Sequence, residues 1–168
     1  VVGGGIAGIT TAISAARQGN TVALVQNRPL LGGNNSSEVR VGLSGLIHQE
    51  PYPNIGNLVD EISPVGHWTF WDAQKNPNTE RSKKILEIVA KDSIRKVHNA
   101  APAENYEDDK KLNAVLAEKN ITLFLNTHMN GVEMEGNKIV SITAIDLKTS
   151  ERIKIKGSLF ADCTGDGH

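Results

Sequence analysis

Three glycines near the start of the chain constrain its fold more than any other feature of the sequence. Gly3, Gly5 and Gly8 follow two valines and precede apolar residues at helical spacing. A strand, a G-x-G-x-x-G turn and a helix in this order are typical of a dinucleotide-binding β-α-β unit. The first glycine allows the tight turn, the second lets a pyrophosphate approach the backbone, and the third lets helix and strand pack closely. The alternative interpretation is a glycine-rich turn without a ligand.

The residues after the turn complete this unit. Apolar side chains recur at helical spacing over 6–16, and Gly19 is expected to end that helix. The apolar, β-branched run over 21–25 predicts a second strand, which should be parallel to the first. We therefore predict an α/β fold with a parallel sheet.

The middle of the chain is expected to be a mainly helical insertion over residues 45–110. Helices are predicted over 55–62, 82–99 and 104–120. In the second of these, the side chains expected to face inward are Ile85, Ile88, Val89 and Val97.

The period of the apolar residues changes to that of strands from Ile121 onward. Strands are predicted over 121–125, 129–134, 139–147 and 152–155. The last three predict an antiparallel β-meander, and a final strand over 159–163 should run into the Thr-Gly-Asp turn that follows it.

Composition and charge exclude several classes of function. The 168 residues carry 18 basic and 19 acidic side chains, a formal charge of −1, so a nucleic-acid-binding surface is not expected. No apolar run approaches the roughly 18 residues of a membrane span. Cys163 is the only cysteine, which excludes an internal disulfide, a CxxC redox pair and a cysteine-built zinc site. No spacing of His, Asp and Glu predicts a metal site.

A ribose-binding residue is expected at the end of the second strand, about 20 residues after the glycine turn. Gln26 occupies this place, and Arg28 follows it. A neutral amide hydrogen-bonds a ribose diol less strongly than a carboxylate does. Arg28 without a neighbouring acid is compatible with a 2′-phosphate, and hence with NADP, or with a solvated loop charge.

Four motifs occur in a fixed order, at 2–8, 26–33, 34–38 and 161–167. Together with the meander they resemble the FAD-dependent oxidoreductases of the glutathione-reductase-like type, and most closely a bacterial family of mostly unassigned substrate. The resemblance implies a three-layer Rossmann-like FAD/NAD(P)-binding domain with a parallel sheet and a β-meander crossover. It also implies flavin-mediated hydride or electron transfer on an unknown small organic substrate.

The resemblance assigns a set of residues to the cofactor, from the pyrophosphate and ribose to the ribityl chain and adenine. In chain order they are Gly3, Gly5, Ile6, Ala7, Gly8, Gln26, Arg28, Gly32, Gly33, Asn34, Ser36, Ser37, Met129, Thr164, Gly165 and Asp166. No catalytic residue is assigned, and His48 is only a weak candidate for a proton donor or flavin neighbour, a surface histidine being the alternative.

The sequence leaves two other functions open. One is an NAD(P)-dependent reductase module, with NAD(P) bound instead of FAD or in addition to it, although the Gly32-Gly33 loop and the meander favour FAD. The other is a non-catalytic dinucleotide-binding or interaction module.

The chain is expected to be a partial FAD-binding domain over 1–168, truncated at both ends, because it opens inside a strand and stops after a glycine turn. The resemblance places a further flavin-contacting segment beyond His168, so this piece alone is expected to bind FAD poorly and to be inactive. Neither the oligomeric state nor the compartment is predicted, and the cytoplasm is only the default.

Overall fold

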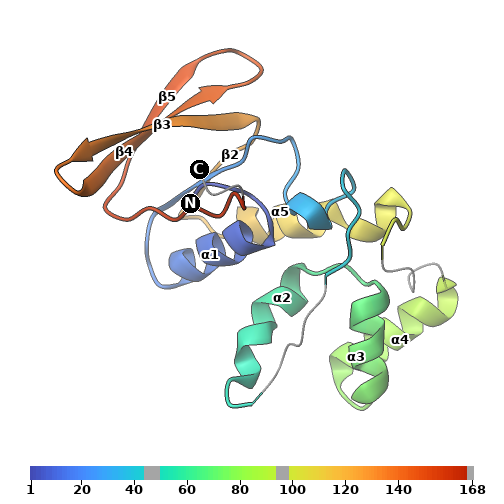
Figure 1. Ribbon diagram of the computed structural model, residues 1–168. Helices are drawn as coiled ribbons and strands as arrows, with labels where there is room; N and C mark the ends of the chain where they lie inside the picture. Colours follow the sequence, from blue (N-terminus) through green and yellow to red (C-terminus); the bar gives the residue numbers. More distant parts are fainter. Residues whose placement is uncertain (44–49, 94–98, 166–168) are drawn as a thin grey trace. The chain divides into compact units, whose positions relative to one another are not determined.

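The computed structural model describes residues 1–43, 50–93 and 99–165 (Figure 1). The chain divides into two compact units. The first consists of Val1–Gly33 with Leu112–His168, and the second of Asn34–Lys111.

A parallel sheet forms the centre of the first unit. Strand β1 (Val22–Val25) pairs in parallel with β2 (Ile121–Phe124) along its whole length. Val2 makes parallel bridges to Val25 on one side and to Asp162 on the other. The N-terminal valines therefore lie between β1 and the segment that returns at the end of the chain, and the predicted parallel β-α-β unit is confirmed.

The final strand predicted over 159–163 is present only as a single bridge at Asp162. Gly3 adopts a φ of +100° immediately after Val2. The N-terminal segment therefore turns away after Val2, and no further residues of it can pair with the returning segment. The prediction was therefore too long, although the direction of the segment was right.

Helix α1 (Ile6–Arg17) packs against β1 and β2 in the first unit. Its buried stripe includes Ile9, Ala12 and Ile13, each of which is fully buried. The helix ends at Gln18, and Gly19 then adopts a φ of +87°. A left-handed glycine is a common way to end a helix, so the predicted helix and its stop signal are both confirmed.

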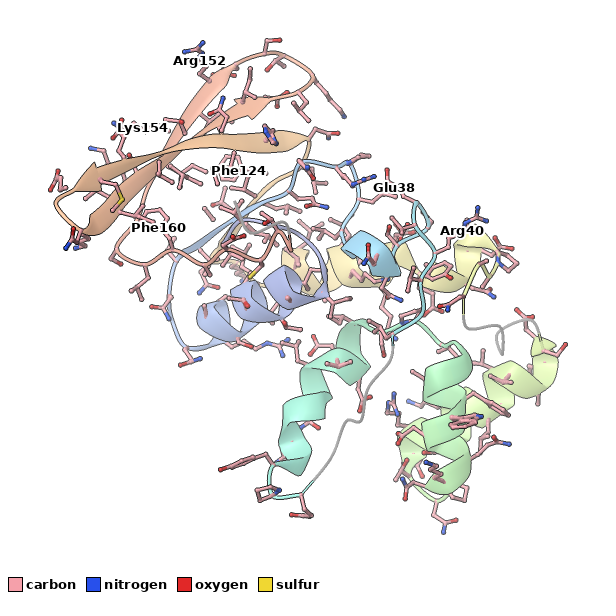
Figure 2. The ribbon with its side chains drawn as sticks, viewed as in Figure 1. Glu38, Arg40, Phe124, Arg152, Lys154 and Phe160 are labelled. Carbon is pink, nitrogen blue, oxygen red and sulfur yellow. The ribbon has the colours of Figure 1, made fainter. Side chains whose placement is uncertain are left out.

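An antiparallel meander completes the first unit, and it consists of β3 (Thr127–Glu135), β4 (Lys138–Asp146) and β5 (Arg152–Lys156) (Figure 1). In β5 the exposed Arg152 and Lys154, labelled in Figure 2, alternate with half-buried isoleucines, which is the period of a strand with one face against protein. The predicted meander, and with it the predicted α/β class, is confirmed.

The second unit is helical. Its helices are α2 (Asn57–Ile62), α3 (His67–Lys75) and α4 (Glu80–Lys91), with single 3₁₀ turns at Pro53–Gly56 and Ala103–Tyr106. α5 (Asp108–Leu116) leads from this unit into the first. Ala73, Ile85 and Val89 form a small apolar core between α3 and α4.

Two predicted helices were too long. α4 ends at Lys91, and Ile88 is 40% exposed because Ile85 and Val89, four residues apart, already define its buried stripe. Val97 lies outside the described residues. The helix predicted over 104–120 is interrupted at Glu107, whose φ of +47° separates the 3₁₀ turn from α5.

Lys111 is the largest fully buried side chain among the described residues. Its ammonium donates to the carbonyl of Tyr106. Desolvation lowers the pKa of Lys111 from its ordinary value of 10.5 to about 8, against the opposing effect of Asp108 and Glu107 and with a further small lowering from Lys110. The folded state therefore favours the neutral amine.

We expect the free energy of unfolding to gain a contribution from Lys111 as the pH rises from about 8 toward 10.5. In this window the unfolded state binds the proton and the folded state has released it, so stability increases with pH. Substitution Lys111→Met should remove this gain, whereas Lys84→Met, at an exposed lysine of α4, should keep it. Urea unfolding followed by circular dichroism at pH 7.5, 9 and 10 measures both slopes, and equal slopes in the two variants would contradict the assignment.

Candidate dinucleotide site

The glycine turn between the first strand and α1 is closed by backbone contacts. The Gly3 N–H donates to the carbonyl of Val25 at 2.8 Å, which fixes the turn to the end of β1. A Cβ on Gly3 would lie 2.4 Å from the carbonyl oxygen of Cys163. Only glycine fits both this contact and the left-handed φ of this position.

Helix α1 begins directly on this turn. Gly5 is its N-cap, in an extended conformation, and its carbonyl accepts the first helical hydrogen bond from Ile9 N–H at 2.9 Å. A Cβ on Gly8 would lie 1.7 Å from the carbonyl oxygen of Gly3, so the third glycine lets the helix lie on the turn. No acidic side chain lies in the first turn, and Ala7 is exposed there. The N–H groups and positive dipole end of α1 therefore make this turn suitable for an anion.

The second glycine bend lies against the first. The Gly32 N–H donates to the Gly4 carbonyl at 2.8 Å, and Gly32 forms a parallel bridge with Gly5. Gly33 has a φ of +57°, and a Cβ on it would lie 3.1 Å from the Cα of Gly5. The two glycine bends are therefore in backbone contact.

A third bend, at the end of the returning segment, also contacts the turn. A Cβ on Gly3 would lie 2.7 Å from the backbone nitrogen of Thr164. The Thr164 N–H and hydroxyl both donate to Oδ1 of Asp162, at 2.9 and 2.7 Å, and Gly165 follows with a φ of +81°. Two predicted residues, Thr164 and Gly165, thus belong to the same cluster of bends as Gly3.

Cys163 serves in packing at this bend. Its Cβ is the closest side-chain atom to a Cβ placed on Gly8, at 3.4 Å, and its Sγ lies 3.8 Å from the hydroxyl oxygen of Thr11. The half-buried thiol fills the space between the third bend and α1.

Gln26 directly follows β1, lies against the glycine turn and is only 5% exposed. Its Oε1 accepts from the Gly4 N–H at 2.9 Å, and its Nε2 donates to the Leu30 carbonyl at 3.0 Å. The side chain predicted to hold the ribose is therefore engaged with the two glycine bends. Arg28, two residues further on, is exposed.

Met129 lies on β3, next to a register irregularity between Met129 and Gly131. The start of β3 is attached to the same region, because Thr127 N–H donates to the Gln26 carbonyl at 2.9 Å. The predicted adenine-side residue and the predicted ribose-side residue are thus on connected segments of one unit.

The remaining predicted residues lie in the second unit or outside the described residues. Asn34, Ser36 and Ser37 belong to the second unit, where Ser36 is fully buried and the Ser37 N–H donates to the carboxylate of Asp108. His48 and Asp166 lie outside the described residues.

Three residues that shape the site were not assigned to it from the sequence. Gly4 joins the two bends through its carbonyl, Leu31 packs where a Gly4 Cβ would lie, and Asp162 holds the Thr164 bend. The run of three consecutive glycines was a usable signal for Gly4, since G-x-G-x-x-G requires no glycine at that position. Leu31 and Asp162 lie inside the motifs at 26–33 and 161–167, but no contact was assigned to either residue there.

Neither a metal site nor a membrane span is found in the part of the chain that the structure describes. No group of three or more His, Cys, Asp or Glu side chains there could hold a metal ion. No helix there has the length and apolar character needed to cross a bilayer.

The parallel sheet, the glycine turn and the helix that starts on it define a Rossmann-type dinucleotide-binding fold. The family described as FAD dependent oxidoreductase matches residues 1–168, so the chain belongs to this family. FAD is therefore the cofactor that family membership assigns, as the sequence analysis predicts. No curated protein matches the chain.

Three solved structures resemble the chain at low identity. The Mycobacterium smegmatis Sdh1 complex in the apo form matches with a TM-score of 0.51 and 12% identity, over 94% of this chain and 32% of that chain. Glycerol-3-phosphate dehydrogenase from Bacillus halodurans, complexed with FAD, matches with a TM-score of 0.49 and 16% identity, over 94% and 32%. L-Proline dehydrogenase from P. horikoshii matches with a TM-score of 0.41 and 20% identity, over 94% and 20%. The chain thus spans between a fifth and a third of these proteins.

We expect Gly3→Ala to destabilise the first unit far more than Gly19→Ala. Both glycines have positive φ, so each alanine costs about 1 kcal/mol in backbone strain. Only at Gly3 does the new Cβ also overlap backbone atoms, which should cost about 3 kcal/mol more, since no atom of the described residues lies within 4 Å of a Cβ on Gly19. Urea unfolding followed by circular dichroism measures the difference, and similar losses in the two variants would show that the close contact at Gly3 is not rigid.

Proposed function

We propose that the three bends of the first unit bind the diphosphate of FAD, and that the protein uses this flavin to transfer hydride or electrons from a small organic substrate. The bends concentrate backbone N–H groups, a helix N-terminus and surfaces without side chains at one place. A dinucleotide needs this combination, because its phosphates must approach the backbone closely.

Gly5 carries the proposal, because packing within the protein does not explain it. Its φ of −70° and ψ of −178° are accessible to any residue. Among the residues that the structure describes, a Cβ there would meet only the Cα of Gly33, at an ordinary contact distance of 4.0 Å. At Gly3, Gly4 and Gly8, by contrast, a Cβ would overlap other protein atoms. A glycine that neither backbone nor packing demands supports close approach of a ligand.

The residues of the bends would hold and orient the cofactor, and bound FAD would supply the electron-transfer chemistry. In the proposed arrangement Ile6, Ala7 and Gly8 present the first N–H groups of α1 to the phosphates. Thr164 and Gly165 close the site from the returning segment. The remaining residues assigned by the resemblance to the adenosine half and the ribityl chain, namely Arg28, Asn34, Ser36, Ser37, Met129 and Asp166, stay proposals, as does His48 for a proton-transfer role.

NAD(P) is the competing cofactor. The contact between the Gly32-Gly33 bend and the glycine turn favours FAD, because a domain that binds only NAD does not need a second glycine bend there. Purified protein of natural full length should show the visible absorbance of oxidised flavin, which bleaches on reduction. A colourless protein that binds NADPH and not FAD would overturn the choice of cofactor.

We expect Gly5→Ala to weaken FAD binding at least tenfold without lowering the melting temperature. Among the described residues the added methyl group makes only an ordinary contact, with the Cα of Gly33, so it should exclude a phosphate while leaving the packing of the fold intact. Flavin fluorescence quenching measures the affinity in the full-length protein, and thermal unfolding of the apoprotein measures the stability.

The matched control is Ser14→Ala, an exposed position on the same helix. It should change neither quantity. FAD affinity in Gly5→Ala equal to that of the wild type and the control would place the diphosphate elsewhere and contradict the proposed function.

A further inference from the structure

We propose that Gln26 is a positioning residue, which holds the glycine turn in its phosphate-binding shape through a neutral amide, and is not the ribose ligand that its place in the sequence indicates. This inference rests on the proposed function, because the shape in question is the one proposed to bind FAD. It concerns how the turn is held and not which cofactor it binds.

The Gln26 side-chain amide uses both its acceptor and its donor in hydrogen bonds within the protein. Its Oε1 accepts a hydrogen bond from the Gly4 N–H at 2.9 Å, and its Nε2 donates one to the Leu30 carbonyl at 3.0 Å. The side chain therefore joins the first glycine bend to the loop that leads into the second bend. At 5% exposure it makes these bonds away from water, where leaving either partner unpaired costs about 1–3 kcal/mol.

The backbone of Gln26 extends this connection to the sheet and the meander. Its N–H donates to the carbonyl of Phe124, labelled in Figure 2 at the end of β2, at 2.8 Å. Its carbonyl accepts from Thr127 N–H, at the start of β3, at 2.9 Å. Four segments thus meet at Gln26. Because its backbone is fixed to β2 and β3, a change in its side chain should alter the glycine turn and leave the sheet in place.

The same contact explains the middle glycine of the turn. A Cβ on Gly4 would lie 2.9 Å from Cβ and 3.0 Å from Cδ of Gln26, and 2.7 Å from Cδ2 of Leu31. The dinucleotide-binding motif does not ask for a glycine here. The close packing of Gly4 on the Gln26 side chain does.

A carboxylate cannot replace the amide in this arrangement. It can accept from the Gly4 N–H, but it has no proton to donate to the Leu30 carbonyl, and two acceptor oxygens would face each other in a buried place. A protonated carboxyl group would restore both bonds. A positioning role requires a hydrogen-bond donor facing the Leu30 carbonyl, which Gln26 has and a carboxylate lacks. A ribose-binding role would favour the carboxylate, because a carboxylate binds a ribose diol better than an amide does.

The test is the pH dependence of Gln26→Glu in the full-length protein. FAD affinity is measured by flavin fluorescence quenching, and the melting temperature of the apoprotein by circular dichroism, both from pH 5 to 9. At low pH the introduced carboxyl group is protonated, and both quantities should approach those of the wild type. As the group ionises, FAD affinity should fall roughly tenfold and the melting temperature should fall with it. The wild type should show no such step.

Two further variants accompany it. Gln26→Met has a similar volume and no hydrogen-bonding end, so it should bind FAD more weakly than the wild type at every pH, without a step. Gln74→Glu makes the same chemical change at an exposed glutamine of α3 and should show no step either.

Tighter FAD binding by Gln26→Glu than by the wild type at high pH, with unchanged apoprotein stability, would overturn the inference and establish a ribose contact. Absence of a pH step in both quantities would also overturn it. A wild type that binds no FAD would overturn the proposed function alone, because the step in the melting temperature of the apoprotein still tests how Gln26 holds the turn.

Discussion

Close contact between backbone segments without side chains is the constraint on which the first unit depends. The turn at Gly3 lies against the carbonyl of Cys163, α1 lies on the turn through Gly8, and the Gly32-Gly33 bend lies against Gly5. A Cβ on Gly3 or Gly8 would overlap backbone atoms, and one on Gly33 would lie only 3.1 Å from the Cα of Gly5. The sheet, the helix and the two later bends therefore occupy their places because these three positions lack a Cβ. Hydrogen bonds accepted by the carbonyls of Val25 and Gly4 and by the carboxylate of Asp162 then hold the segments in register.

These contacts connect the fold to the proposed chemistry. The hydrogen bonds that close the turn leave the first N–H groups of α1 at its surface, next to the exposed Ala7 and without an acidic neighbour in the first turn. The protein thus gathers an electropositive helix end and a surface free of side chains at one point. Family membership identifies the cofactor as FAD, and the geometry supports the place proposed for its diphosphate.

The periodicity of apolar residues was sufficient to predict the helices and strands that depend on local interactions or pair with segments nearby in the sequence. The helix after the turn, the strand that follows it and the meander all appear where alternation or helical spacing predicts them. The errors occur where tertiary contacts decide. Glu107 adopts a left-handed conformation while its carboxylate accepts from Val65 N–H, which divides a helix that periodicity alone would continue. The two hydrogen-bond partners of the Gln26 side chain could not be predicted for a related reason, because its position in the motif indicates a ligand contact and only the packed structure shows Gly4 and Leu30 beside it.

Gly3, Gly4, Gly5 and Gly8 are not required for the same reason, and this difference affects what the motif shows about function in related proteins. A descendant that lost its nucleotide would still need glycine at positions 3, 4 and 8, since the protein's own atoms exclude larger residues there. Under the proposed function position 5 would be free to vary, because among the described residues a Cβ there makes only an ordinary contact with Gly33. Under the proposed function, variation confined to Gly5 would therefore indicate lost cofactor binding even where the other glycines of the motif are kept.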